Sequence, residues 1–301
     1  MSLAATDSGK VNAVRSRWSF GLKWPIVTGI GFFHLGILAA PFFFTWKAVL
    51  ISLVLVWMTG GLGICLGYHR LLTHQSFETY RPVRWLIASL GALAGQGPPI
   101  DWVATHRKHH RHSDQKSDPH SPQHGAWWSH VLWLMPHQSR WSLKRCYRRY
   151  APDLLRDPFM RFIGKTYGLW HVAAGVALFS VGWLGWNLYT GVSFLVYGMF
   201  VRLVYVYHIT WFVNSATHIW GYRRYATDDN SRNLWWVGLV AFGEGWHNNH
   251  HASQRLARHG HRWWEVDVTY IAICVMEKLG LAWKVMRDLP STMKPLTASR
   301  R

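Results

Sequence analysis

Four stretches of the chain are long and apolar, and polar, basic segments separate them. The first two extend over about residues 25–46 and 47–67 without a charged residue in their interiors, the third over 167–186, and the fourth, 191–212, contains Arg202. About 20 apolar residues in a helix are enough to cross the hydrocarbon core of a bilayer. The pattern therefore predicts an all-α integral membrane protein with four transmembrane helices.

The positions of the basic residues orient these helices. Only Lys47 lies in the turns, near Trp46 and residues 187–190, that would join the spans into two hairpins. By the positive-inside rule, both termini are expected on the cytoplasmic side of a bacterial inner or similar membrane. We therefore expect a single domain, 1–301. In it, 68–166 and 213–290 form a cytoplasmic helical cap, with an amphipathic helix near 263–285 and a loose basic tail at 291–301.

The composition is typical of a basic membrane protein. The 301 residues include 21 Trp, half are apolar, and the formal net charge is +19. The long uncharged apolar runs argue against a soluble nucleic-acid-binding protein. Cys65, Cys146 and Cys274 lie far apart, which argues against a disulfide framework and against thiolate metal sites. The N-terminal residues lack the apolar core of a signal peptide.

Histidines are concentrated at the predicted cytoplasmic ends of the spans. Of the 19 in the chain, nine fall into four groups: YHRLLTH (His69, His74), HRKHH (His106, His109, His110), NSATH (His218, with Asn214) and EGWHNNHH (His247, His250, His251). On a helix, the spacing HxxHH places all three imidazoles on one stripe. Neutral imidazoles are typical ligands of first-row metals. Nine are too many for one ion, but they suit two ions with four or five ligands each.

His69 and His74 do not follow this geometry. Residues five apart lie about 140° from each other on an ideal α-helix, so this pair converges only if the helix end unwinds or the metal lies off its edge. The isolated histidines are expected to be interfacial or hydrogen-bonded core residues: His34, His171, His208, His259 and His261. The basic residues around HRKHH are expected to face anionic lipid head groups rather than nucleic acid.

The histidine groups and their surroundings resemble the membrane fatty acyl desaturases, in the delta-9 acyl-lipid and acyl-CoA branch. The segments concerned are GLGICLGYHRLLTHQSF, DWVATHRKHHRHSDQKSDPHSP, WWSHVLWLM, VNSATH, FGEGWHNNHHA and RHGHRWWEVDVT, within roughly residues 47–285. The resemblance implies that the nine grouped histidines bind two iron ions and that Asn214 reaches one of them through water. It also implies that Trp102 lines a tunnel for the acyl chain and that the product carries a cis double bond, at the delta-9 position.

The inferred reaction requires a redox-active metal. No general base can deprotonate an unactivated methylene, so a metal–oxygen oxidant must remove its hydrogen. Zinc, which readily occupies histidine sites in purified material, cannot change its oxidation state. We therefore expect two iron ions, with O2 as co-substrate. The groups expected to fix the imidazole tautomers are Asp114, Asp118, His120 and Glu244, each of which would also suit a cap, a loop or a surface ion pair.

Two partners remain open. Ala104 and Thr105 stand where animal acyl-CoA desaturases carry charged residues, which favours acyl chains on membrane glycerolipids, although the basic run Lys144–Tyr150 also suits the phosphates of coenzyme A. The sequence has no flavin fingerprint, iron–sulfur pattern or cytochrome-like domain. The electrons are therefore expected from a separate ferredoxin or small cytochrome with its reductase. Such donors are usually acidic, and a basic cytoplasmic face would speed their encounter.

Three other functions would use part of the same pattern. A diiron fatty acyl or alkyl hydroxylase needs the same histidine boxes and differs only in its product. A zinc hydrolase needs an open water site and a glutamate base, for which Glu244 is the only nearby residue. A metal carrier would not need the extended matches around the boxes.

Overall fold

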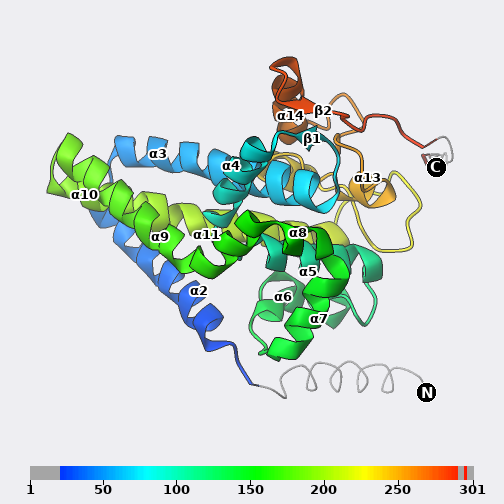
Figure 1. Cartoon of the computed structure of the whole chain (residues 1–301), viewed down its shortest axis with the longest axis horizontal. Coiled ribbons are helices and arrows are strands. Elements are labelled where there is room, and N and C mark those ends of the chain that lie inside the picture. The colour runs from blue at the N-terminus through cyan, green and yellow to red at the C-terminus, as the bar shows by residue number, and fades with distance from the viewer. Residues whose placement is uncertain (1–20, 291–294, 297–301) are drawn as a thin grey trace.

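The computed structural model describes residues 21–290 and 295–296, which form a helical protein with two ends of different character (Figure 1). Four helical stretches, Trp24–Phe43, Trp46–Thr73, Pro158–Gly185 and Leu188–Ile219, are long and apolar enough to cross a membrane. The turns that join these stretches lie at one end of the molecule, and the shorter helices gather at the opposite end. The chain is therefore a helical membrane protein, as its apolar pattern predicted. The N-terminal arm and most of the expected basic tail lie outside the described residues.

Each long stretch has its own helical geometry. The first is α2 (Trp24–Gly36), followed by a 3-10 segment, Ile37–Phe43, in which Pro41 cannot donate to an α-helical ladder. The second is α3 (Trp46–Val56), which continues as a π-helix over Trp57–Thr73. The third is α9 (Pro158–Gly185). The fourth joins α10 (Leu188–Leu195), a π-helical segment (Val196–Val201) and α11 (Arg202–Ile219).

Polar caps determine where these helices begin. The side chain of Thr45 accepts a hydrogen bond from the backbone N–H of Ala48, and Asp157 accepts one from that of Phe159. Such caps satisfy amides that the first helical turn leaves unpaired. Because Asp157 caps α9 and Pro158 is well suited to the first turn, the helix begins at residue 158, nine residues before the span expected from residue 167.

Two other helical stretches also continue beyond the expected spans, and one expected helix is shorter than the sequence indicated. The second and fourth stretches continue to Thr73 and Ile219, beyond 67 and 212, so both extend past the expected spans and carry histidines. The helix expected near 263–285 is confined to α14 (Val268–Lys278), and Gly280, with a φ of 71°, turns the chain just after it. The chain then forms β2 (Ala282–Trp283), which pairs antiparallel with β1 (Glu78–Thr79).

The turns between the long helices lie together at the end remote from the short helices. The hydroxyl of Tyr189 donates to the carbonyl oxygen of Phe42 at 3.1 Å, and the ammonium of Lys47 lies 4.7 Å from the ring centre of Trp186. Near this end, Leu184 is 81% exposed. Other large apolar side chains along the outer faces of these helices are exposed too. An apolar outer surface of this extent requires a lipid environment.

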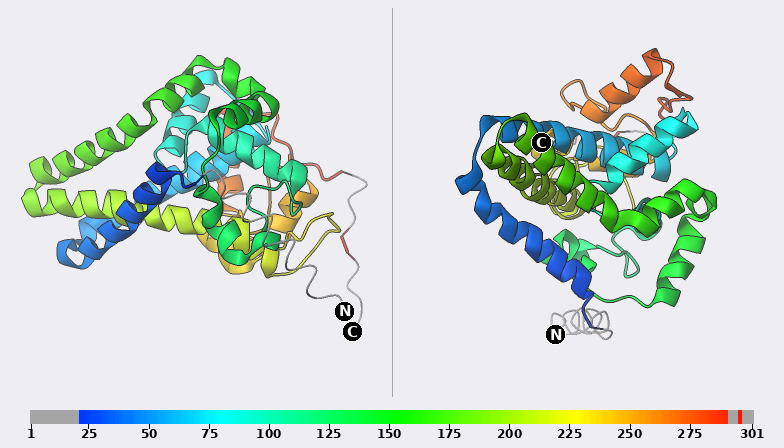
Figure 2. Two further views of the ribbon diagram at one scale, coloured as in Figure 1. Left: turned by 90° about the horizontal axis from the view of Figure 1, so that it is seen from below. Right: turned by 60° about the vertical axis from the view of Figure 1, so that its left-hand side comes forward.

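The short helices surround the inner ends of the long ones. They are α4 (Arg81–Ala92), α5 (Pro99–His112), α6 (Ala126–His130), α7 (Arg140–Tyr150), α8 (Pro152–Arg156), α12 (Trp235–Val240) and α13 (His247–Ala252), with 3-10 turns at Pro122–His124 and Leu132–Leu134. A core that includes Leu72, Val103, Leu154 and Ile163 joins α5, α8 and α9 to the π-helix. Figure 2 shows α2 and α14 on opposite sides of the molecule.

The π-helix and α4 pack backbone against backbone. A Cβ atom on Gly63 would lie 2.5 Å from the backbone nitrogen of Gly91, and one on Gly91 would lie 2.8 Å from the carbonyl oxygen of Gly63. Real Cβ atoms do not approach other atoms this closely, so both positions need glycine. This contact holds the π-helix against α4, whose last turn leads into the loop before α5.

Candidate metal centre

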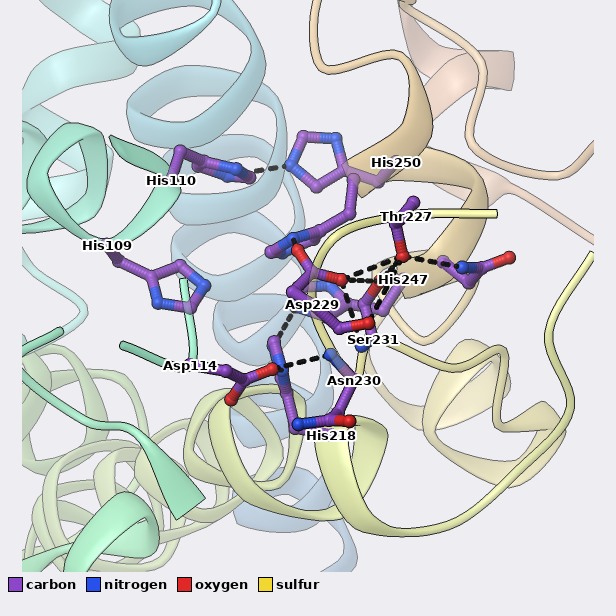
Figure 3. Close-up of polar contacts among 12 residues, drawn as sticks. His109, His110, Asp114, His218, Thr227, Asp229, Asn230, Ser231, His247 and His250 are labelled. Carbon is purple, nitrogen blue, oxygen red and sulfur yellow. Dashed lines mark hydrogen bonds and ion pairs between the residues drawn. The ribbon is translucent and has the colours of Figure 1, made fainter. Parts of the chain in front are cut away.

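The structure brings all nine grouped histidines together, in two clusters. In each cluster, the ligand nitrogens of the member side chains lie within 4.8 Å of one another. The five-histidine cluster consists of His69, His74, His106, His110 and His250, and the four-histidine cluster consists of His109, His218, His247 and His251. Figure 3 shows the contact between the ring nitrogens of His110 and His250, with His109, His218 and His247 nearby.

The two HxxHH segments each contribute to both clusters. In α5, His106 and His110 belong to the five-histidine cluster and His109 to the other, whereas α13 gives His250 to the first and His247 and His251 to the second. The clusters are therefore adjacent, and the ring centres of His110 and His251 are 4.5 Å apart. The sequence predicted that these imidazoles share a stripe, but not that the stripe would divide between two clusters.

The π-helix resolves the difficulty posed by His69 and His74. In this geometry the backbone bonds to the residue five positions earlier, and the N–H of His74 donates to the carbonyl oxygen of His69 at 3.1 Å. Residues five apart then lie on nearly the same face, and the two ring centres are 4.8 Å apart. The helix does not unwind at this point; it widens.

The spacing of the imidazole nitrogens fits metal coordination. The Nε2 atoms of His69 and His250, and of His218 and His247, are 3.1 Å apart, and those of His106 and His110 are 3.0 Å apart. Two nitrogens at about 2.1 Å from one ion and at right angles to each other would be about 3.0 Å apart. Three further buried Nε2 atoms have no hydrogen-bond partner among the described residues, those of His74, His109 and His251. Such orphaned acceptors are costly unless a cation binds them.

Four carboxylates contact the outer nitrogens of the clusters. Nδ1 of His69 lies 2.7 Å from Glu244, that of His109 lies 3.0 Å from Asp118, and that of His218 lies 3.0 Å from Asp114. A carboxylate that accepts the Nδ1 proton fixes the tautomer and turns Nε2 toward a metal. His120, named with these three in the sequence prediction, makes no such bond; its ring stacks on that of His109, with centres 4.2 Å apart.

The fourth carboxylate, Asp229, was missed by the sequence analysis. It lies 2.5 Å from Nδ1 of His251, and its other oxygen accepts hydrogen bonds from Thr227 and Ser231 (Figure 3). The segment around it, ATDDNS, has no helical spacing to a histidine box. The only available signal was a short Asp-rich turn, which is common in loops without any function.

Burial keeps six of the nine grouped imidazoles neutral. It lowers the pKa of His251 to about 4 and lowers the pKa values of five others well below the ordinary value, namely His74, His106, His110, His247 and His250. His109 differs. Burial lowers its pKa, but the adjacent carboxylate of Asp118 outweighs this effect, so the pKa is raised overall. Neutral imidazoles keep the lone pairs that a metal needs.

The pKa values of the four carboxylates beside the clusters are lowered although burial alone would raise them. Burial raises the pKa of Glu244, but His69 and Arg70 outweigh it and hold that pKa well below its usual range. The imidazoles that Asp114, Asp118 and Asp229 contact lower the pKa values of these groups in the same way. At neutral pH the site therefore combines anionic carboxylates with the six imidazoles that burial keeps neutral.

Glu244 is the centre of a buried charge network. Arg70, which is fully buried, lies 3.1 Å from Glu244 and 2.9 Å from Asp267, and Nδ1 of His259 lies 3.2 Å from Glu244. The carboxylate is thus enclosed by Arg70, His69 and His259. His259 is a buried, hydrogen-bonded residue, as expected, but it is not remote from the clusters: its ring centre lies 4.4 Å from that of His250, with the two ring planes tilted by 37°.

Two further residues named from the sequence lie beside the clusters. The ring of Trp102 stacks on that of His106 at 4.8 Å, and its Nε1 donates to Gln96, whose amide donates to Thr210 on α11. Asn214 precedes His218 by one helical turn on α11, and its side chain has no hydrogen bond within the part of the chain that the structure describes.

Comparisons with known proteins define the class. Residues 44–267 match the model of the family described as fatty acid desaturase. The chain is 46% identical over 270 residues to an sn-2 palmitoyl-lipid 9-desaturase of Nostoc sp. (strain 36), covering 89% of this chain and 92% of that protein. It is 45% identical over 287 residues to an sn-1 stearoyl-lipid 9-desaturase of Anabaena variabilis, with coverages of 95% and 97%. It is 42% identical over 257 residues to an acyl-CoA 5-desaturase of Anemone leveillei, with coverages of 85% and 77%.

The chain therefore belongs to the fatty acid desaturase family. It is an oxidoreductase that acts on fatty acyl chains, and its histidine clusters fit a metal-dependent enzyme.

Proposed function

We propose that this protein is an O2-dependent diiron desaturase that introduces a cis double bond at the 9-position of an acyl chain on a membrane glycerolipid. The observation that carries the proposal is the division of nine imidazoles between two adjacent clusters, each large enough for one ion, in a member of the desaturase family. The 9-position and the lipid substrate follow the names of the relatives from Nostoc and Anabaena. The uncharged Ala104 and Thr105, where animal acyl-CoA desaturases carry charged residues, also favour the lipid substrate.

The reaction balances as a four-electron reduction of O2. Two hydrogen atoms leave neighbouring methylene carbons, a separate donor supplies two electrons, water supplies two protons, and two water molecules form. Bound iron would supply the redox chemistry that breaking an unactivated C–H bond requires. His69, His109, His218 and His251 would present Nε2 to the ions because carboxylates hold their Nδ1 protons, and Asn214 would reach one ion through water.

The acyl chain would pass between α5 and α11. Trp102 stands against His106, and the hydrogen bonds through Gln96 to Thr210 fix its ring between these two helices. A rigid wall beside the ions would hold two particular carbons in position for the reaction. We place the two turns near Lys47 and Trp186 on the far side of the membrane and the cap with both termini in the cytoplasm, because the basic residues concentrate in the cap.

The test is fatty-acid analysis of a desaturase-deficient bacterial host that expresses this chain with a ferredoxin and its reductase. We expect a new cis-9 double bond, first in phospholipid and not in the acyl-CoA pool. His106→Ala should abolish it. His171→Ala should not, because Nδ1 of His171 donates to the carbonyl oxygen of Tyr167 on its own helix α9 and the residue belongs to neither cluster. A hydroxylated product would show that the protein is a hydroxylase and not a desaturase. A double bond that appears first in the acyl-CoA pool would show that the substrate is acyl-CoA and not a lipid.

A further inference from the structure

A hollow of about 660 Å³ opens on the surface of the cap beside the five-histidine cluster. The imidazoles of His74 and His110 form part of its wall, and the remainder is mostly polar or charged: Thr73, Gln75, Arg107, Arg111, Pro152, Asp153, Gln254 and Arg255. Both histidines belong to the cluster proposed to hold an ion. The hollow therefore leads from the surface directly to two ligands.

Two arginines give this hollow an unbalanced positive charge. Arg107 is neutralised, since its guanidinium contacts both oxygens of Asp153, at 2.7 and 3.0 Å, and also donates to the carbonyl of Leu72. Arg111 and Arg255 are exposed, and neither has a hydrogen bond or ion pair within the described part of the chain. They are available to an anionic partner.

The two clusters differ in their access to this surface. His109, His218, His247 and His251 are all buried, and none of them lines the hollow. In the five-histidine cluster, His110 is only partly buried. The two proposed ions are therefore not equivalent toward a partner outside the protein.

We infer that the hollow is the docking site of a small acidic one-electron carrier and that electrons enter through the five-histidine cluster. The inference rests on the proposed function, in which each double bond requires two donor molecules, each oxidised by one electron, with O2 as the final acceptor. A substrate head group is a poorer occupant. With a head group against His74 and His110, the first carbons of the acyl chain, and not carbon 9, would lie at the cluster.

The test uses the full chain in nanodiscs, loaded with iron, with an acidic [2Fe–2S] ferredoxin and its reductase as the electron source. The variants are Arg111→Glu with Arg255→Glu, and Arg111→Lys with Arg255→Lys. Lys144→Glu is the matched control, because Lys144 is an exposed basic residue on α7 outside the hollow. Three quantities are measured for each: ferredoxin binding to the nanodiscs, ferredoxin-driven desaturation, and single-turnover desaturation after chemical reduction with dithionite.

We expect the Glu pair to weaken ferredoxin binding and to lower the ferredoxin-driven rate roughly tenfold at low salt, with the loss diminishing as salt screens the charges. The dithionite-driven turnover should stay within about twofold of wild type, because rim charges act on encounter and not on the chemistry. The Lys pair should bind as wild type does.

Four outcomes would overturn the inference: unchanged ferredoxin binding in the Glu pair, an equal loss with dithionite, a raised KM for the acyl substrate alone, or a loss confined to Lys144→Glu, which would move docking to α7. Absence of any double bond in the wild type would count against the proposed function, while the binding measurement would still decide the docking site.

Discussion

The backbone N–H of His74 donates to the carbonyl oxygen of His69 at 3.1 Å, and this single π-helical bond places two imidazoles of one helix end in the same cluster. An α-helix with the same sequence would turn them about 140° apart. The side chain of Thr73 supports the same pattern, since its hydroxyl donates to the carbonyl of Tyr68, also five residues earlier. π-helical segments frequently occur at functional sites, and here one determines the number of ligands in a cluster.

The unequal clusters should respond differently to the loss of one ligand. His247→Ala leaves three imidazoles in the four-histidine cluster, and we expect about one iron per chain in place of two. His74→Ala leaves four in the other cluster, so both ions should remain, with weaker binding. Metal analysis after anaerobic purification, with His171→Ala as control, checks this. Equal loss in both variants would show that the clusters do not bind ions independently.

Asp229 should be required for iron binding and activity because it orients His251. In Asp229→Asn the Nδ1 proton of His251 loses its anionic acceptor, and we expect iron affinity or activity to fall about 10- to 100-fold. Asp228→Asn is the matched control, since Asp228 is the exposed neighbour. Iron titration and desaturation assays would detect the difference. If the two variants behaved alike, the contact between Asp229 and His251 would not contribute to iron binding or activity.

The contact between the π-helix and α4 should not tolerate a methyl group. Gly63→Ala would force the two backbones apart, at a cost of about 1–3 kcal/mol, and should lower the melting temperature of the detergent-solubilised protein. Gly29→Ala on α2 meets no atom within 4 Å and should be neutral or slightly stabilising, because alanine favours helix over glycine. A Gly63→Ala variant as stable as wild type would disprove the close approach.

The metal-free protein should lose stability on mild acidification. Burial lowers the pKa of His251 from 6.5 to about 4 in the folded protein, so between these values the unfolded chain binds a proton that the folded chain does not. Stability is therefore fully present above pH 6.5 and falls as the pH drops toward 4. The other low-pKa imidazoles add to this slope.

Melting temperatures between pH 7.5 and 4 measure this effect. His251→Asn removes one of the titrating groups, so its pH profile should be shallower than that of the wild type. Bound metal should shift the loss to lower pH, because protons then compete with the ion. A flat wild-type profile over this range would contradict the prediction.

The sequence predicted those features that depend on local spacing. The four apolar stretches and the grouping of the histidines into boxes follow from the local sequence. Glu244, Asp118 and Asp114 lie near the boxes, but only the contact of Asp118 with His109 is local, because Glu244 contacts His69 and Asp114 contacts His218 from distant segments. The helices extend beyond the expected spans, because a cap such as Asp157 begins α9 nine residues before the apolar stretch at residue 167.

What the sequence did not reveal depends on packing between distant segments. Asp229 reaches His251 from a loop, and the division of HxxHH between clusters requires two helices to face each other. The hollow forms where residues 73–75, 107–111, 152–153 and 254–255 meet. No local spacing encodes such an encounter.

The pairing of β1 with β2 determines when the centre can be completed. Beyond β2, the backbone N–H of Met286 donates to the carbonyl of Ser76 beside His74, and the carbonyl of Met286 accepts from Ala257. Chains fold from the N-terminus as they leave the ribosome, so all nine histidines are synthesised before the strand that fastens the loop after His74. The pairing of β1 with β2 therefore forms only after all nine histidines of the two clusters have been synthesised, and a chain truncated before residue 282 would carry every one of them without the strand that fastens the loop after His74.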